Sequence, residues 1–77
     1  MMENKALDRY QIPYTNLVVR KFAERNKMTL DAAFAYLLKF GGIQYLVDFY
    51  DVEHTLPLED TIDEITQTCH AAGGAIV

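Results

Sequence analysis

The chain has 77 residues, of which 51% are hydrophobic and 23% are charged, and Cys69 is its one cysteine. This length permits one hydrophobic core and excludes a second domain, while the composition excludes an intrinsically disordered chain. A lone cysteine excludes an intramolecular disulfide and favours a reducing, cytoplasmic location. We expect no signal peptide in residues 1–9 and no membrane span, because no apolar stretch approaches the roughly 20 residues that a span requires.

The net charge is −4, and the two signs are separated along the chain. Six of the seven basic residues precede Met28, whereas Lys39 is the only basic residue after it, among eight acidic ones. Such a dipolar chain can attract another copy of itself or a charged partner. The simpler interpretation is that both sets of charges lie on solvated helix faces.

Two helices are predicted in the first half of the chain. Apolar residues recur at helical spacing from Tyr14 to about Lys27, and Pro13 suits the first turn of this helix because its missing N–H costs nothing there. Thr29 is a good N-cap for a second helix, which Gly41 should end at about Phe40. The apolar stripe of this second helix is Leu30, Ala33, Phe34, Leu37 and Leu38.

The second half is less regular. Residues 43–50 fit both helical spacing and strand alternation, and we favour helix. A last helix should run from Leu58 to Ala72, with a narrow apolar stripe at alternating spacings of four and three residues, and the Gly73-Gly74 pair should end it. We expect residues 73–77 to form a frayed tail and residues 1–12 a loosely held helical arm.

The sequence thus predicts a compact, all-α single domain of three or four helices spanning residues 1–77. Its predicted core is Leu17, Val18, Phe22, Phe34, Leu37, Leu38, Leu46, Ile62 and Ile65.

No active site is recognisable. Cys69 and His70 are adjacent, and neighbours on a helix point about 100° apart, so they cannot readily share a metal ion. Cys69 lies on an apolar stripe, where a free cysteine behaves as a small hydrophobe. A catalytic pocket would need more interior than 77 residues provide. We therefore expect no enzymatic activity, no metal and no cofactor.

The run Tyr50-Asp51-Val52-Glu53-His54-Thr55 concentrates aromatic, acidic, imidazole and hydroxyl groups in what we expect to be a connection between helices. Connections carry function more often than cores do. The structural alternative is that Thr55 caps the last helix, that Pro57 sits in its first turn, and that His54 bonds a nearby backbone carbonyl.

The same run carries a resemblance to a known family. Together with the Gly-x-Ile-x-Tyr-Leu element at residues 41–46 and the Ile-x-Glu-Ile element at residues 62–65, it resembles a family of short bacterial proteins of unknown function. The match covers about a third of the chain, and its most specific part is the His54-Thr55 pair. Members are often encoded beside toxin-like proteins, some similar to ADP-ribosyltransferases. The resemblance implies an antitoxin-like companion and assigns no catalytic residue.

A helix, glycine pair and helix around Gly41 also suggest a helix-turn-helix motif. Residues 42–51, however, contain no basic residue that could contact phosphates or base edges. DNA binding by this pair of helices is therefore not expected. The alternative function is a nucleic-acid-binding regulator that uses the basic residues of the N-terminal helix, namely Arg20, Lys21, Arg25 and Lys27.

The preferred function is a protein-binding module. Its acidic residues should meet a basic partner, such as the surface of a toxin, although they could equally serve only to solubilise a helix. The predicted partner-binding residues are Asp51, Glu53, His54, Glu59, Asp60, Asp63 and Glu64. With five tyrosines and four phenylalanines in so small a chain, we also expect a two-fold homodimer. Its predicted interface is Tyr36, Tyr45, Phe49 and Tyr50.

Overall fold

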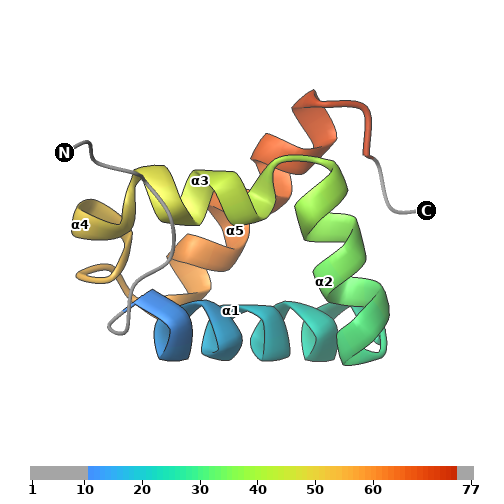
Figure 1. Ribbon diagram of the computed structural model, residues 1–77, viewed down its shortest axis with the longest axis horizontal. Coiled ribbons are helices and arrows are strands. Elements are labelled where there is room, and N and C mark those ends of the chain that lie inside the picture. The colour runs from blue at the N-terminus through green and yellow to red at the C-terminus, as the bar shows by residue number, and fades with distance from the viewer. Residues whose placement is uncertain (1–10, 75–77) are drawn as a thin grey trace, which may run out of the picture.

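The computed structural model of the protein describes residues 11–74, which form five α-helices (Figure 1). These are α1 (Gln11–Asn26), α2 (Leu30–Lys39), α3 (Gly42–Asp48), α4 (Tyr50–Glu53) and α5 (Leu58–Ala71). No strand occurs in this range, so the all-α prediction is confirmed and residues 43–50 are helical apart from a break at Phe49. That break creates one helix more than predicted, because the run after it forms the short helix α4 rather than a loop.

The helices surround one core. In Figure 1, α1 and α3 lie above one another with α2 crossing between them at one end, while α4 lies at the other end. The last helix, α5, passes behind and contacts both α1 and α3. Because α2 occupies an end of the molecule, only one side of it faces other helices.

The ends of the helices follow their local sequence. Thr29 caps α2, since its side-chain oxygen accepts a hydrogen bond from the backbone N–H of Ala32 at 3.1 Å. Gly41 follows α2 with φ +88°, the left-handed conformation expected of the residue that ends a helix. Lys27 takes the same role after α1 with φ +56°. Pro13 lies in the first turn of α1, as predicted.

The corner between α2 and α3 depends on Gly42. A Cβ atom at this position would lie 2.7 Å from Leu37 Cδ2 and 3.1 Å from the Cys69 sulfur. The glycine therefore allows the start of α3 to approach both α2 and α5 more closely than any other residue would. Cys69 is fully buried there, as predicted for a small hydrophobe, and burial raises the pKa of its thiol.

The residues that form the core differ in part from those predicted from the sequence. Val18, Phe22, Leu37, Leu46, Ile62 and Ile65 are buried, which confirms these six assignments. The prediction was wrong for Leu17, Phe34 and Leu38, whose side chains are 37, 43 and 59% exposed. For Phe34 and Leu38 the reason is the position of α2, which contacts its neighbours through the side that carries Ala33 and Leu37. Leu17 belongs to α1, where Val18 and Phe22 occupy the buried side instead. The core also takes in Val19, Ala23, Ala33, Ile43 and Cys69.

The connection from α4 to α5 differs in part from the prediction. His54 Nδ1 lies 2.6 Å from the carbonyl oxygen of Tyr50, which confirms its bond to a nearby backbone carbonyl. Thr55 does not cap α5, because its hydroxyl donates backwards to the Val52 carbonyl at 2.7 Å. Pro57 itself stands at the N-cap position, one residue before the first turn, and α5 begins at Leu58 without a side-chain cap.

The two predicted terminal segments lie mostly outside the described residues. Of the expected N-terminal arm, Gln11 and Ile12 belong to α1, and residues 1–10 lie outside the description. Of the expected C-terminal tail, Gly73 and Gly74 are held against the fold: Gly74 N–H donates to the Cys69 carbonyl at 2.9 Å, and the Tyr36 hydroxyl donates to the Gly74 carbonyl. Within the described helices, none has the length and apolar character needed to cross a bilayer.

We predict that Gly42→Ala lowers the free energy of unfolding by about 1–3 kcal/mol, because the added methyl overlaps Leu37 and Cys69. This loss should exceed the gain from the higher helix propensity of alanine. Chemical denaturation followed by circular dichroism measures it. Gln44→Ala, at an exposed position of the same helix, is the control and should change stability by less than about 0.5 kcal/mol. Equal behaviour of the two variants would contradict the role given to this corner.

Candidate protein-interaction surface

One face of α2 exposes a continuous row of large apolar side chains. Leu30, Phe34 and Leu38 are 54, 43 and 59% exposed, and their spacing of four residues places them one above another along the helix. We call these three residues the α2 stripe. Single exposed apolar residues are ordinary on protein surfaces, but a contiguous row marks an interaction site more often than chance exposure.

The α2 stripe borders a shallow groove between α1 and α2. Asn16, Val19 and Arg20 of α1 line it together with Leu30 and Phe34 of the stripe, and Asp31 completes the lining. Val19 is almost completely buried beneath it. The groove is therefore apolar on its α2 side, and charged groups of both signs, Arg20 and Asp31, lie at its edge.

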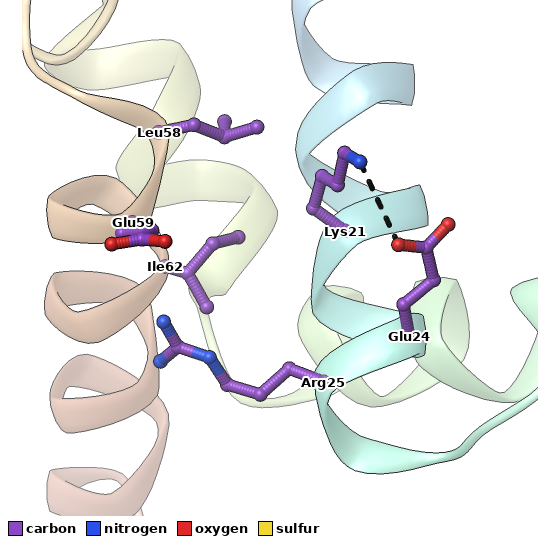
Figure 2. A pocket seen from close by; sticks show the side chains of 6 residues that line it. All are labelled: Lys21, Glu24, Arg25, Leu58, Glu59 and Ile62. Carbon is purple, nitrogen blue, oxygen red and sulfur yellow. Dashed lines mark ion pairs between the residues drawn. The ribbon is translucent and has the colours of Figure 1, made fainter.

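A second groove lies between α1 and α5 (Figure 2). Leu58 and Ile62 of α5 supply its apolar part. Arg25 reaches toward α5 from α1, whereas the amine of Lys21 is turned to Glu24. Ile62 is almost fully buried and Leu58 half-buried, so little apolar area is free. This groove is a weaker candidate for docking a protein than the α2 stripe.

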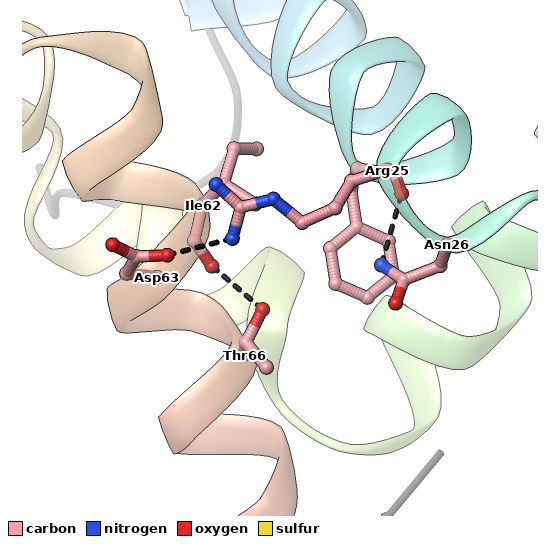
Figure 3. Close-up of polar contacts among 6 residues, drawn as sticks. Arg25, Asn26, Ile62, Asp63 and Thr66 are labelled. Carbon is pink, nitrogen blue, oxygen red and sulfur yellow. Dashed lines mark hydrogen bonds and ion pairs between the residues drawn. The ribbon is translucent and has the colours of Figure 1, made fainter. Parts of the chain in front are cut away.

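The basic side chains of α1 are divided between these two grooves. Arg20 lies in the first groove, and Lys21 and Arg25 lie in the second. Lys21 is 3.6 Å from Glu24, and Arg25 is 2.6 Å from Asp63 of α5, which joins the two helices (Figure 3). Nearby acids thus neutralise two of the four basic residues on which the nucleic-acid alternative depends.

The predicted partner-binding residues are not all on the surface. Those with exposed side chains are Asp51, His54, Glu59, Asp60 and Asp63. Glu59, Asp60 and Asp63 are exposed on α5, but Glu59 also lines the groove between α1 and α5, and Asp63 is occupied by Arg25. Glu64 is half-buried, and Glu53 is only 2% exposed. A buried carboxyl cannot meet a partner, so Glu53 does not belong to the acidic surface that we predicted.

Glu53 instead belongs to a buried polar cluster. Its Oε2 is 3.3 Å from the Tyr45 hydroxyl, which also lies 3.0 Å from Oε1 of Glu64. The Thr61 hydroxyl donates to the Glu53 carbonyl at 3.2 Å, and the Tyr14 hydroxyl lies 3.3 Å from Thr61 Oγ1. Among the described residues, Oε1 of Glu53 has no hydrogen-bond partner.

This cluster favours a protonated carboxyl. The Tyr45 hydroxyl has one hydrogen and can donate to only one of its two carboxyl neighbours, so the second contact is satisfied only if that carboxyl is protonated. Burial raises the pKa of Glu53, and the neighbouring Glu64 raises it further. Burial and the same two carboxyls raise the pKa of Tyr45 to about 12. Protonation of this cluster therefore makes the stability of the fold depend on pH. Because Glu53 is buried, its carboxyl is not available to a partner.

The aromatic residues predicted to form a dimer interface mostly pack within the molecule. Tyr36 stacks on Phe22 with ring centroids 5.6 Å apart and contacts Phe40 at 5.0 Å. Tyr45, as described above, takes part in the buried cluster. Phe49 is 49% exposed, and Tyr50 is half-buried with its ring stacked on His54. The dimer stays a prediction, but these four side chains do not form one exposed patch.

Residues 11–74 hold no group of three or more histidine, cysteine or acidic side chains that could bind a metal ion. Cys69 is buried and His70 is exposed, so the structure separates the two adjacent residues as expected.

Sequence analysis named every residue of the α2 stripe but placed two of them, Phe34 and Leu38, in the core. The width of the hydrophobic pattern along this helix could have identified the stripe as exposed. Hydrophobic residues at eight of the nine positions from Leu30 to Leu38, all except Asp31, cover more of the helix than one face of a small domain can bury.

Comparison with known proteins gives a family. The family model described as "Protein of unknown function (DUF3791)" matches residues 13–72. This range contains all five helices except the first two residues of α1. No match was found among curated proteins or among solved structures.

We predict that Glu53→Gln reduces the pH dependence of stability. A carboxyl whose pKa is raised by folding stabilises the fold fully at a pH below its unfolded value of 4.5, and this contribution is lost as pH rises through the folded value. Denaturation of both proteins between pH 4 and pH 7 should therefore show that the wild type loses stability relative to the variant as pH rises.

Glu59→Gln is the matched control for this measurement, since Glu59 is an exposed carboxyl. It should follow the wild-type pH profile. If Glu53→Gln follows the wild-type profile as well, the carboxyl of Glu53 is not protonated in the folded protein.

Proposed function

The chain belongs to the DUF3791 family of unknown function, and we propose that it is a protein-binding module that docks on its partner through the α2 stripe. The observation that carries this proposal is the exposure of Leu30, Phe34 and Leu38 in one row. Transferring such side chains from water into an interface is favourable by roughly 1.5–3 kcal/mol for each one fully buried.

The small size of the domain also supports this proposal. A domain of this length buries a modest fraction of its surface, so it gains stability from any partner that covers an apolar face. In the described part of the chain, moreover, no cluster of metal-binding side chains occurs, and the free thiol of Cys69 is buried. Binding, rather than catalysis, is what these residues are suited to perform.

The finer proposal concerns the identity of the partner. The motifs at residues 50–55 and 62–65 resemble a family whose members are encoded beside toxin-like proteins, and we propose an antitoxin-like role on that basis. A basic surface on the toxin-like protein would be attracted electrostatically to the exposed acids Glu59 and Asp60. These acids would attract the partner, and the α2 stripe would hold it.

The alternative of a nucleic-acid-binding regulator has less support. Binding the phosphate backbone needs several cations on one face. Here Arg20 faces one groove, Lys21 and Arg25 face another, and the latter two have acidic neighbours. No other arrangement of the described basic residues favours this function.

We predict that Phe34→Ser combined with Leu38→Ser weakens binding to the proposed toxin-like partner by about a hundredfold, as expected for central apolar contacts. Titration calorimetry with the two purified proteins measures the dissociation constant. Val52→Ser is the matched control, because Val52 is 57% exposed and lies outside the stripe. Unchanged affinity of the double variant, or an equal loss in the control, would remove the stripe from the binding surface.

A second prediction concerns the acids. Glu59→Lys with Asp60→Lys should slow association with the same partner by about tenfold at low salt, because the attractive field is lost. The difference should shrink as salt rises. Stopped-flow mixing measures the rate, and Asp48→Lys, at an exposed acid of α3, is the control. Asp63 is left in place since it holds Arg25. Equal association rates of the variant and the wild type at low salt would exclude the acidic attraction.

A further inference from the structure

We propose that a second copy of this chain covers the α2 stripe in the free protein, with the two α2 helices packed antiparallel about a two-fold axis near Phe34. This inference deepens the proposed function and rests on it in one respect, because it takes the α2 stripe to be a binding surface. It replaces the aromatic interface predicted from the sequence, whose members Tyr36 and Tyr45 are engaged within the fold.

The surface of α2 has the shape that such pairing requires. The exposed row Leu30, Phe34 and Leu38 runs beside a second exposed row with the same four-residue spacing, Asp31, Ala35 and Lys39. The commonest helix packing inserts a row of this kind into the groove between two such rows of the facing helix. Ala35 is small and central in the second row, so the apolar row of another copy can approach the helix closely there.

Charge decides the direction of the pairing. Asp31 lies in the first turn of α2, and Lys39 lies in its last turn. In an antiparallel pair, each Asp31 lies near Lys39 of the second copy, and the two helix dipoles oppose one another favourably. A parallel pair would place Asp31 against Asp31 and Lys39 against Lys39. The same two residues therefore favour the antiparallel arrangement and disfavour the parallel one.

Both charges are available for this role. Neither Asp31 nor Lys39 forms an ion pair with any residue between 11 and 74. Lys39 lies 5.3 Å above the ring of Phe40, a contact that is weak at an exposed site. About a two-fold axis near Phe34, each copy contributes one Asp31 and one Lys39, and each faces the opposite charge of the other copy. The interface is therefore complementary to itself.

Pairing of this kind would regulate the site. The second copy occupies the α2 stripe, so a partner that uses the same side chains can bind only after the dimer dissociates. The apparent affinity for the partner then falls in proportion to the fraction of chain that is monomeric. Dilution of the free protein should increase that fraction.

The first experiment is sedimentation equilibrium of the full chain without any partner. We expect a species of twice the 8.8 kDa chain mass at micromolar concentration. Phe34→Ser should weaken its dimerisation by about tenfold or more, as for a central interface residue. Val52→Ser is the control and should leave the dimer intact. A wild-type monomer at high micromolar concentration overturns the proposal, as does a dimer that Phe34→Ser leaves unchanged.

The second experiment exchanges the charges. Asp31→Lys alone and Lys39→Asp alone should each weaken self-association by about tenfold, because each places like charges together. An equimolar mixture of the two single variants should recover wild-type dimerisation, and so should the double variant. Glu59→Lys is the control for losing an acid in a first helical turn, since Glu59 holds that position in α5. Failure of both the mixture and the double variant to recover dimerisation would contradict antiparallel pairing.

The inference and the proposed function can fail separately. If the wild type is monomeric but the stripe variants lose the toxin-like partner, only the dimer is wrong. If the dimer depends on Phe34 but partner binding does not, the inference stands and the proposed use of the stripe for the partner is wrong.

Discussion

The close approach at Gly42 is the constraint on which the arrangement of the molecule depends. The start of α3 lies against Leu37 of α2 and Cys69 of α5, at distances that leave no room for a Cβ atom. Gly41, in the left-handed conformation, turns the chain just before this point. Together the two glycines fold α3 back over α1 and hold α2 across the end of the domain, in contact with helices on one side only.

The exposed stripe is a consequence of that corner. A helix that contacts its neighbours on one side buries about one third of its surface, and in α2 that third is filled by Ala33 and Leu37. Leu30, Phe34 and Leu38 lie just beyond the contact. The chain could have placed polar residues there at no loss to its core, yet it carries large apolar ones. The proposed binding of a partner would account for them, since they contribute little to the core.

The acidic residues of the second half of the chain occupy two environments that the sequence does not distinguish. Glu59 and Asp60 face outward near the start of α5, where the helix dipole favours acids and a basic partner could be attracted. Glu53, only six residues before Glu59, points inward to Tyr45. Its burial raises its pKa and favours the protonated form. Counting acids along the chain therefore overstates the charge that a partner would meet.

The sequence by itself determined the helical class, the cap at Thr29, the turn at Gly41 and six of the buried core residues, because each depends on local spacing or on one residue's backbone preference. It also named each residue of the α2 stripe. Only the tertiary structure decided that Leu30, Phe34 and Leu38 face solvent while Glu53 does not. The physical reason is that helical periodicity shows which residues share a face, but burial depends on which other helices reach that face.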